Sequence, residues 1–78
     1  MLTVLSREYC HLCHDMIAAL KEVQQSKMFE FKVIDVDENP EWEEKYGELV
    51  PVLLAGDEEI CHYYLDNAAL NDYLAKIG

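Results

Sequence analysis

The sequence predicts a mixed α/β fold with the element order β-α-β-α-β-β-α, and three observations point to it. Short apolar runs over residues 2–6 and 29–37 are typical of strands, and they flank a helical pattern over residues 11–25. A strand–helix–strand unit this short normally makes its two strands parallel. A later pair of apolar runs surrounds Gly56 and Asp57, which favour a hairpin turn. We therefore expect one mixed four-stranded sheet with flanking helices.

The first helix is predicted from a single apolar stripe. Its members recur at gaps of three, one, three and three residues and are Cys13, Met16, Ile17, Leu20 and Val23. This spacing places them on one face of a helix, with polar and charged side chains on the other. The helix should therefore bury one face against the sheet, with Cys13 at the start of that face.

The other two helices are predicted from their ends. Asn39 and Asp66 are residue types that cap helix starts, and Pro40 suits a first turn. Gly47 suits the end of the second helix. The third helix has apolar residues at positions i, i+3, i+4 and i+7, which are Leu70, Tyr73, Leu74 and Ile77. Both helices should therefore pack on the sheet.

Length and charge limit the classes of protein to consider. The 78 residues suffice for one domain, residues 1–78, and sixteen acidic against six basic residues give a net charge of −10. Such a charge repels nucleic acid and anionic membrane surfaces. No apolar run approaches the ~18 residues of a membrane span, and residues 1–10 lack the features of a signal peptide. Three cysteines are too few for a secreted disulfide scaffold, so we expect a cytoplasmic monomer.

The motif with the clearest chemistry is Cys10-His11-Leu12-Cys13. Cys10 falls at the start of the predicted helix, where unpaired N–H groups and the positive end of the helix dipole favour a thiolate. Cys13 lies one turn later on the apolar stripe. We therefore expect Cys10 to be exposed and Cys13 to be partly buried. This asymmetry predicts that Cys10 attacks a disulfide and that Cys13 resolves the resulting mixed disulfide.

Charged neighbours of the motif act in opposite directions. Arg7, the only arginine, lies three residues before Cys10 and is suited to stabilise its thiolate or to hold a carboxylate of a peptide substrate. A charged His11 would also favour the thiolate, whereas Glu8 and the acidic surface oppose it. We take Arg7, His11 and Leu12 as candidate substrate-binding residues.

Two other interpretations of the cysteines remain open, structural packing and a zinc site. The side chains of Cys10, Cys13, His14, Cys61 and His62 are of the types that bind zinc. Cys61 and His62 are neighbours on a predicted strand, however, and should point to opposite faces. We therefore predict no metal site, and we expect Cys61 to be a half-buried strand residue. A non-catalytic binding module, or a carrier of zinc or an iron–sulfur cluster, is the alternative function.

The segments SREYCHLC, VIDVDENP, KYGELVPVLL and the final LD…L resemble small bacterial glutaredoxin-like proteins of the thioredoxin-fold superfamily. The resemblance covers nearly the whole chain. It implies a glutaredoxin-like thioredoxin fold and a thiol–disulfide oxidoreductase that acts on small-molecule or protein disulfides. It also implies that Cys10 is the nucleophile and Cys13 the resolving thiol.

The same resemblance implies how a substrate is held. Pro51 is similar to a cis-proline that packs beside the cysteine pair. Val50 would offer its backbone N–H and C=O to an extended substrate, much like an added strand. Arg7 occupies the place of a basic residue that helps glutaredoxins to bind glutathione.

The chain departs from glutaredoxins at several positions. His-Leu replaces the Pro-Tyr between the cysteines, and Leu49 replaces the threonine before Val-Pro. HYYLDN stands where Gly-Gly and an aspartate hold the γ-glutamyl end of glutathione, and Asp66 is only loosely comparable. We therefore expect no tightly bound cofactor. The expected partner is a disulfide-containing protein or a small thiol such as glutathione, which is a possible co-substrate.

Overall fold

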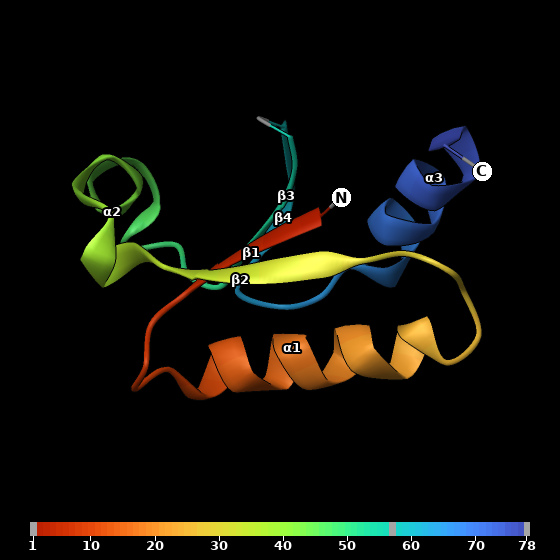
Figure 1. Ribbon diagram of the computed structural model, residues 1–78, viewed down its shortest axis with the longest axis horizontal. Coiled ribbons are helices and arrows are strands. Elements are labelled where there is room, and N and C mark those ends of the chain that lie inside the picture. The colour runs from red at the N-terminus through yellow and green to blue at the C-terminus, as the bar shows by residue number, and fades with distance from the viewer. Residues whose placement is uncertain (1, 57, 78) are drawn as a thin grey trace.

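The structure is a computed structural model that describes residues 2–56 and 58–77, and the described elements follow the predicted order (Figure 1). A 3-10 turn, η1, is the one addition between the second strand and the second helix. The elements are β1 (Leu2–Ser6), α1 (His11–Gln24), β2 (Phe31–Asp35), η1 (Val36–Glu38), α2 (Pro40–Tyr46), β3 (Val52–Ala55), β4 (Glu58–His62) and α3 (Asn67–Ile77).

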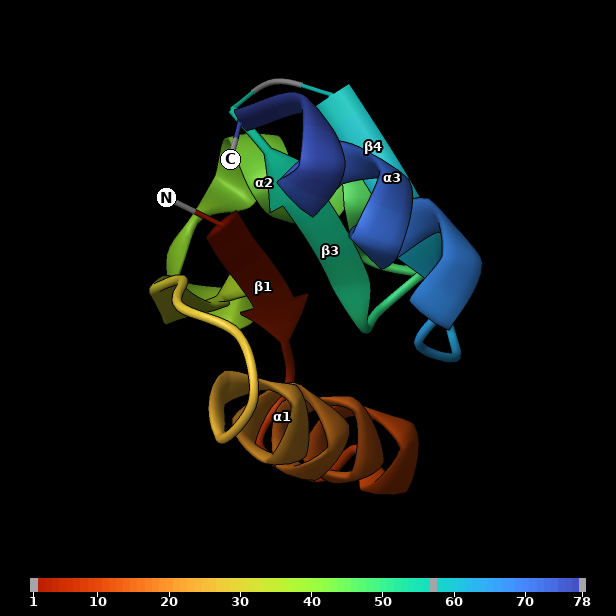
Figure 2. The ribbon, with the colours of Figure 1, turned by 90° about the vertical axis from the view of Figure 1, so that its right-hand side faces the viewer.

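The four strands form one mixed sheet, as predicted, and their order in it is β2-β1-β3-β4. β1 is parallel to β2 and antiparallel to β3, and β3 is antiparallel to β4. Figure 2 shows β1 and β3 side by side. Because of these directions, the chain leaves β1, β2 and β4 and enters β3 at the same edge. We call this the cysteine edge, because Cys10 follows β1 there.

β1 is covered on both faces of the sheet, which explains its nearly continuous apolar sequence. Val4 belongs to a core cluster with Met16 of α1 and Leu70 of α3. Its neighbour Leu5 points to the opposite face and packs in a second cluster with Tyr46 of α2. α1 and α3 therefore cover one face, and η1 and α2 cover the other. Figure 1 shows α1 running along the sheet with its first turn near the end of β1.

The second strand is shorter than the predicted range 29–37. It ends at Asp35, because Asp35 Oδ1 accepts the N–H of Asp37 at 2.8 Å and turns the chain into η1. Asn39 precedes α2 as expected, but its side chain makes no capping hydrogen bond there. Its Nδ2 instead donates to the Asp35 carbonyl oxygen at 3.1 Å. Local hydrogen bonds of Asp35 thus changed the connection between β2 and α2 rather than the elements themselves.

The remaining turn and cap agree with the sequence. Asp66 Oδ1 accepts the N–H of Ala69 at 3.1 Å and so caps the start of α3. Gly56 has a φ of 63°, a left-handed conformation that glycine adopts without strain. Asp57, the other predicted turn residue, lies outside the described residues. None of the helices in the described ranges is long and apolar enough to cross a bilayer.

Candidate functional site

Cys10 lies at the N-cap position of α1. Its backbone is extended, with φ −108° and ψ 110°, and its Sγ accepts the backbone N–H of Cys13 at 3.2 Å. The sulfur thus takes the place that a serine or aspartate oxygen takes at other helix starts. Cys10 is half-buried, so it is less exposed than the sequence predicts, but solvent still reaches it.

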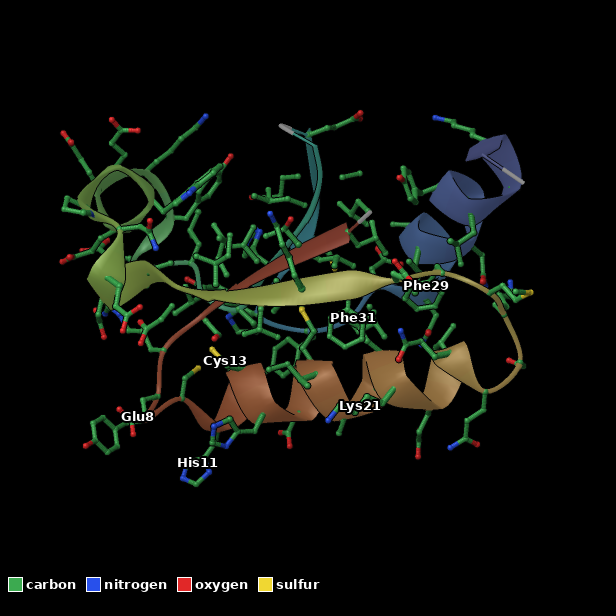
Figure 3. The ribbon with its side chains drawn as sticks, viewed as in Figure 1. Glu8, His11, Cys13, Lys21, Phe29 and Phe31 are labelled. Atoms are coloured by element: carbon green, nitrogen blue, oxygen red, sulfur yellow. The ribbon has the colours of Figure 1, made fainter. Side chains whose placement is uncertain are left out.

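Cys13 is completely buried, with 0% of its surface exposed, where the sequence predicts partial burial. Figure 3 shows its side chain pointing from α1 toward the sheet. Burial, as the largest cause, together with the hydrogen bond to Cys10, raises the pKa of Cys13 from 9.0 to about 12. A backbone hydrogen bond with Arg7 and the charge of Arg7 lower the pKa in part. At neutral pH Cys13 therefore holds its proton.

The Arg7 guanidinium lies among carboxylates. Its Nε is 3.1 Å from Oδ1 of Asp37 in η1, and its Nη2 is 3.8 Å from Oε1 of Glu43 in α2. The contact at Nε lacks hydrogen-bond alignment, so it is an ion pair only. Gly47 leaves room for this arrangement, because a Cβ there would lie 3.1 Å from Arg7 Nη2 and collide with the Glu43 carbonyl oxygen. The predicted role of Arg7 in substrate binding stays a prediction.

A cleft of about 480 Å³ lies beside Arg7 at the cysteine edge. Arg7 and Leu49 line it together with residues from the end of α2 and the following loop, which are Glu43, Glu44, Lys45, Gly47 and Glu48. The lining contains three glutamates and two basic residues, Arg7 and Lys45, whereas Leu49 supplies apolar surface. The cleft therefore offers a mixed, mainly polar surface next to the motif.

The Val50–Pro51 segment enters β3 at the same edge. The peptide bond between them is cis, as the resemblance implied. Pro51 is buried, and its carbonyl oxygen accepts the N–H of Tyr63 at 2.8 Å. Among the described residues, neither the N–H nor the C=O of Val50 has a hydrogen-bond partner. Both groups thus have the capacity to pair with an added strand.

The residues between the cysteines lie on different sides of α1. His11 is exposed and points away from the sheet in Figure 3, whereas Leu12 is half-buried. Tyr9, directly before Cys10, is 94% exposed. Tyr9 is not among the site residues predicted from the sequence, although its aromatic side chain and its position directly before the motif are both visible in the sequence. The substrate-binding roles of His11 and Leu12 stay predictions.

The third cysteine, Cys61, belongs to β4. Cys61 is half-buried, as expected, and packs against the cluster that α1 and α3 cover. Its burial raises the pKa of its thiol above the ordinary value. His62 is exposed, and its Nδ1 lies 3.1 Å from Glu59 Oε2. Within residues 2–56 and 58–77, no three His, Cys, Asp or Glu side chains are grouped so that they could hold a metal ion.

Comparison with known proteins identifies the family. Residues 1–75 match the family described as Glutaredoxin-like domain (DUF836). This chain belongs to the glutaredoxin-like domain family. Because the match spans almost the whole sequence, it includes both cysteines, Val50 and Pro51.

Solved structures agree with this family and show the fold. Protein Ne2328 from Nitrosomonas europaea is 44% identical over 92% of this chain and 87% of its own, with a TM-score of 0.84. Protein XcR50 from X. campestris is 29% identical over 97% of both chains, with a TM-score of 0.70. Thioredoxin 1 from Thermosipho africanus, 22% identical over 97% of this chain and 88% of its own, has a TM-score of 0.56 and shows the thioredoxin fold. No curated protein matches the sequence.

Proposed function

We propose that this glutaredoxin-like protein is a thiol–disulfide oxidoreductase in which Cys10 attacks and Cys13 resolves. The asymmetry of the two thiols is the observation that supports it. Cys10 Sγ is solvent-accessible and accepts a helix N–H, whereas Cys13 is fully buried with a pKa of about 12. A dithiol that exchanges disulfides needs this difference, because one sulfur must react first and the other must wait.

In the first step the Cys10 thiolate attacks one sulfur of a substrate disulfide. A bond forms between Cys10 Sγ and that sulfur, and the substrate S–S bond breaks. The other substrate sulfur leaves as a thiolate and takes a proton from water. The Cys13 N–H, 3.2 Å from Cys10 Sγ, supports the negative charge before the attack.

In the second step Cys13 loses its proton and attacks Cys10 Sγ. The new Cys10–Cys13 disulfide releases the second substrate thiolate, so two electrons have passed from protein to substrate. Two of the influences that raise the pKa of Cys13 come from the Cys10 hydrogen bond and charge. They vanish once Cys10 is bonded to the substrate, whereas the lowering effect of Arg7 persists. Burial, the largest cause of the raised pKa, remains in the mixed disulfide, so the pKa of Cys13 falls there only by the part that Cys10 contributes.

The proposed substrates are disulfides in proteins or small molecules. Val50 would hold an extended chain beside Cys10 through its backbone N–H and C=O, and a thiol such as glutathione would return the oxidised protein to its dithiol form. The proposed setting is a cytoplasmic monomer without a tightly bound cofactor.

A thiol titration against defined redox buffers tests the proposal. We expect one reversible two-electron couple in the wild-type protein and in Cys61→Ser, and none in Cys10→Ser. Absence of a couple in the wild type would contradict the proposal. If elemental analysis of a wild-type protein without this couple also showed near-stoichiometric zinc or iron, the carrier function would replace the proposed oxidoreductase function.

A second experiment tests which cysteine attacks the substrate and which one resolves the mixed disulfide. Cys13→Ser removes the resolving thiol, so a mixed disulfide should accumulate on Cys10 when the reduced variant meets a disulfide. Mass spectrometry of the digested protein locates the adduct. An adduct on Cys61 instead of Cys10 would show that the roles are assigned to the wrong thiols.

A further inference from the structure

Tyr63 has an unusual backbone conformation. Its φ is 65°, and it is the only non-glycine residue in the described ranges with a positive φ. The N–H of Tyr64 donates to the His62 carbonyl oxygen at 2.7 Å, so Tyr63 is the central residue of a three-residue turn. Such a turn with a positive central φ is rare and strained for a residue with a side chain. Other contacts must therefore hold Tyr63 in place.

Two hydrogen bonds connect Tyr63 to the segment that enters β3. Its backbone N–H donates to the Pro51 carbonyl oxygen at 2.8 Å, and its hydroxyl donates to the Glu48 carbonyl oxygen at 3.2 Å. These two acceptors lie on either side of Leu49 and Val50. The ring of His62 packs edge-on against the Tyr63 ring, with centroids 4.7 Å apart, and restricts the ring further. Tyr63 thus spans the segment 48–51 from the side of β4.

Leu49 and Val50 in this segment pack against the core cluster below α2, but the segment has few other backbone hydrogen bonds among the described residues. Leu49 donates its N–H to Tyr46 O at 2.8 Å, and Val50 has no backbone partner among the described residues. A loop with unpaired backbone groups binds an extended chain well only when its own conformation is already ordered, because ordering it on binding would cost affinity. The two Tyr63 bonds supply that order on both sides of Val50.

We propose that Tyr63 is a positioning residue. It holds the backbone of Val50 in the conformation that binds the extended peptide segment next to the attacked disulfide. This inference rests on the proposed function and names its substrate class. Peptide disulfides use the Val50 edge. Small disulfides without a peptide backbone react at Cys10 alone and do not depend on Tyr63.

Tyr63→Phe tests the inference, because it removes the hydroxyl bond and keeps the ring. Tyr64→Phe is the matched control, since Tyr64 is 69% exposed and its hydroxyl has no partner among the described residues. The pre-reduced proteins react in single turnovers with a neutral cyclic peptide disulfide and with hydroxyethyl disulfide. In Tyr63→Phe the half-saturating peptide concentration should rise about fivefold, the effect of one lost hydrogen bond. The maximal rate and the hydroxyethyl disulfide reaction should not change.

Amide hydrogen exchange provides a readout that does not depend on turnover. The backbone amide hydrogens at positions 49 and 63 should exchange faster in Tyr63→Phe than in the wild type or in Tyr64→Phe. Unchanged exchange and unchanged peptide saturation would overturn the inference, as would an equal loss of both disulfide reactions. A wild-type protein that reduces neither disulfide would instead overturn the proposed function, and the substrate role of Tyr63 with it.

Discussion

Cys10 and Cys13 are separated by two residues, but they lie in different environments. Cys10 precedes the first turn of α1, so its sulfur meets the unpaired helix N–H groups. Cys13 is one turn further along, on the face that packs against the sheet. The helical period predicted which thiol would be buried, whereas the full extent of burial depends on the sheet and loops around it.

Because Cys13 is buried, the free energy of unfolding should depend on pH in the alkaline range. Its pKa is 9.0 in an ordinary setting and about 12 in the folded protein. Between these values the unfolded chain has lost a proton that the folded protein still binds, so the free energy of unfolding should fall as pH rises from about 9. Urea denaturation at several pH values measures this fall. Cys13→Ser should show a shallower fall, and equal slopes in both proteins would contradict the pKa shift.

At the scale of elements, the helix starts show which local signals survive folding. Asp66 caps α3 as predicted, and within residues 2–56 and 58–77 its carboxylate has the Ala69 N–H, at 3.1 Å, as its one hydrogen-bond partner. Asn39 has the same potential, but its amide donates to Asp35 O, across the turn that ends β2. A cap is therefore predictable from sequence where the preceding segment offers no better partner.

The cap of α3 should contribute measurably to stability. Asp66→Ala removes the oxygen that accepts the Ala69 N–H and should lower the free energy of unfolding by about 1 kcal/mol. Asp66→Asn is the control, because its side-chain oxygen still accepts that N–H. Chemical denaturation compares the three proteins. A loss of the same size in both variants would mean that the charge of Asp66, rather than its hydrogen bond, matters.

At the scale of the whole molecule, acidic charge dominates the surface. The net charge is −10, and the two carboxylates that pair with Arg7 belong to the same edge as Cys10. Arg7 is thus partly neutralised by Asp37 and Glu43 rather than left to attract an anion. An approaching disulfide meets a negative field, which accelerates cations and slows anions.

This field should appear in the rates of small disulfides. Reduced protein should react about tenfold faster with cystamine, a dication, than with dithiodipropionate, a dianion, at low ionic strength. The difference should shrink as added salt shortens the screening length to ~10 Å and below. Stopped-flow measurements at increasing salt concentration check both statements, with neutral hydroxyethyl disulfide as the reference. A faster reaction with the anion would show that Arg7 outweighs the surrounding acids.

The fold was predictable because its signals are local. Apolar runs, one helical stripe, helix-end residues and the Val-Pro pair each report a preference of neighbouring residues, and all of them agreed on one element order. The parallel direction of the first two strands followed from general rules for short connections, whereas the strand order was not predicted. The strand over residues 29–37 was overestimated, because the bond from Asp37 to Asp35 that ends it is a turn contact rather than a change in hydropathy.

The sequence alone determined the element order, the edge at which Cys10 lies and which cysteine is buried. Only the tertiary structure decided what surrounds that edge. Arg7, placed near Cys10 by spacing, pairs instead with carboxylates from η1 and α2, and Tyr63 reaches across to Glu48 and Pro51. These partners are distant in sequence, and no period or cap encodes them. They meet because the strand directions bring four chain segments to one edge of the sheet. There, side chains and backbone groups that are distant in sequence come close enough to form ion pairs and hydrogen bonds.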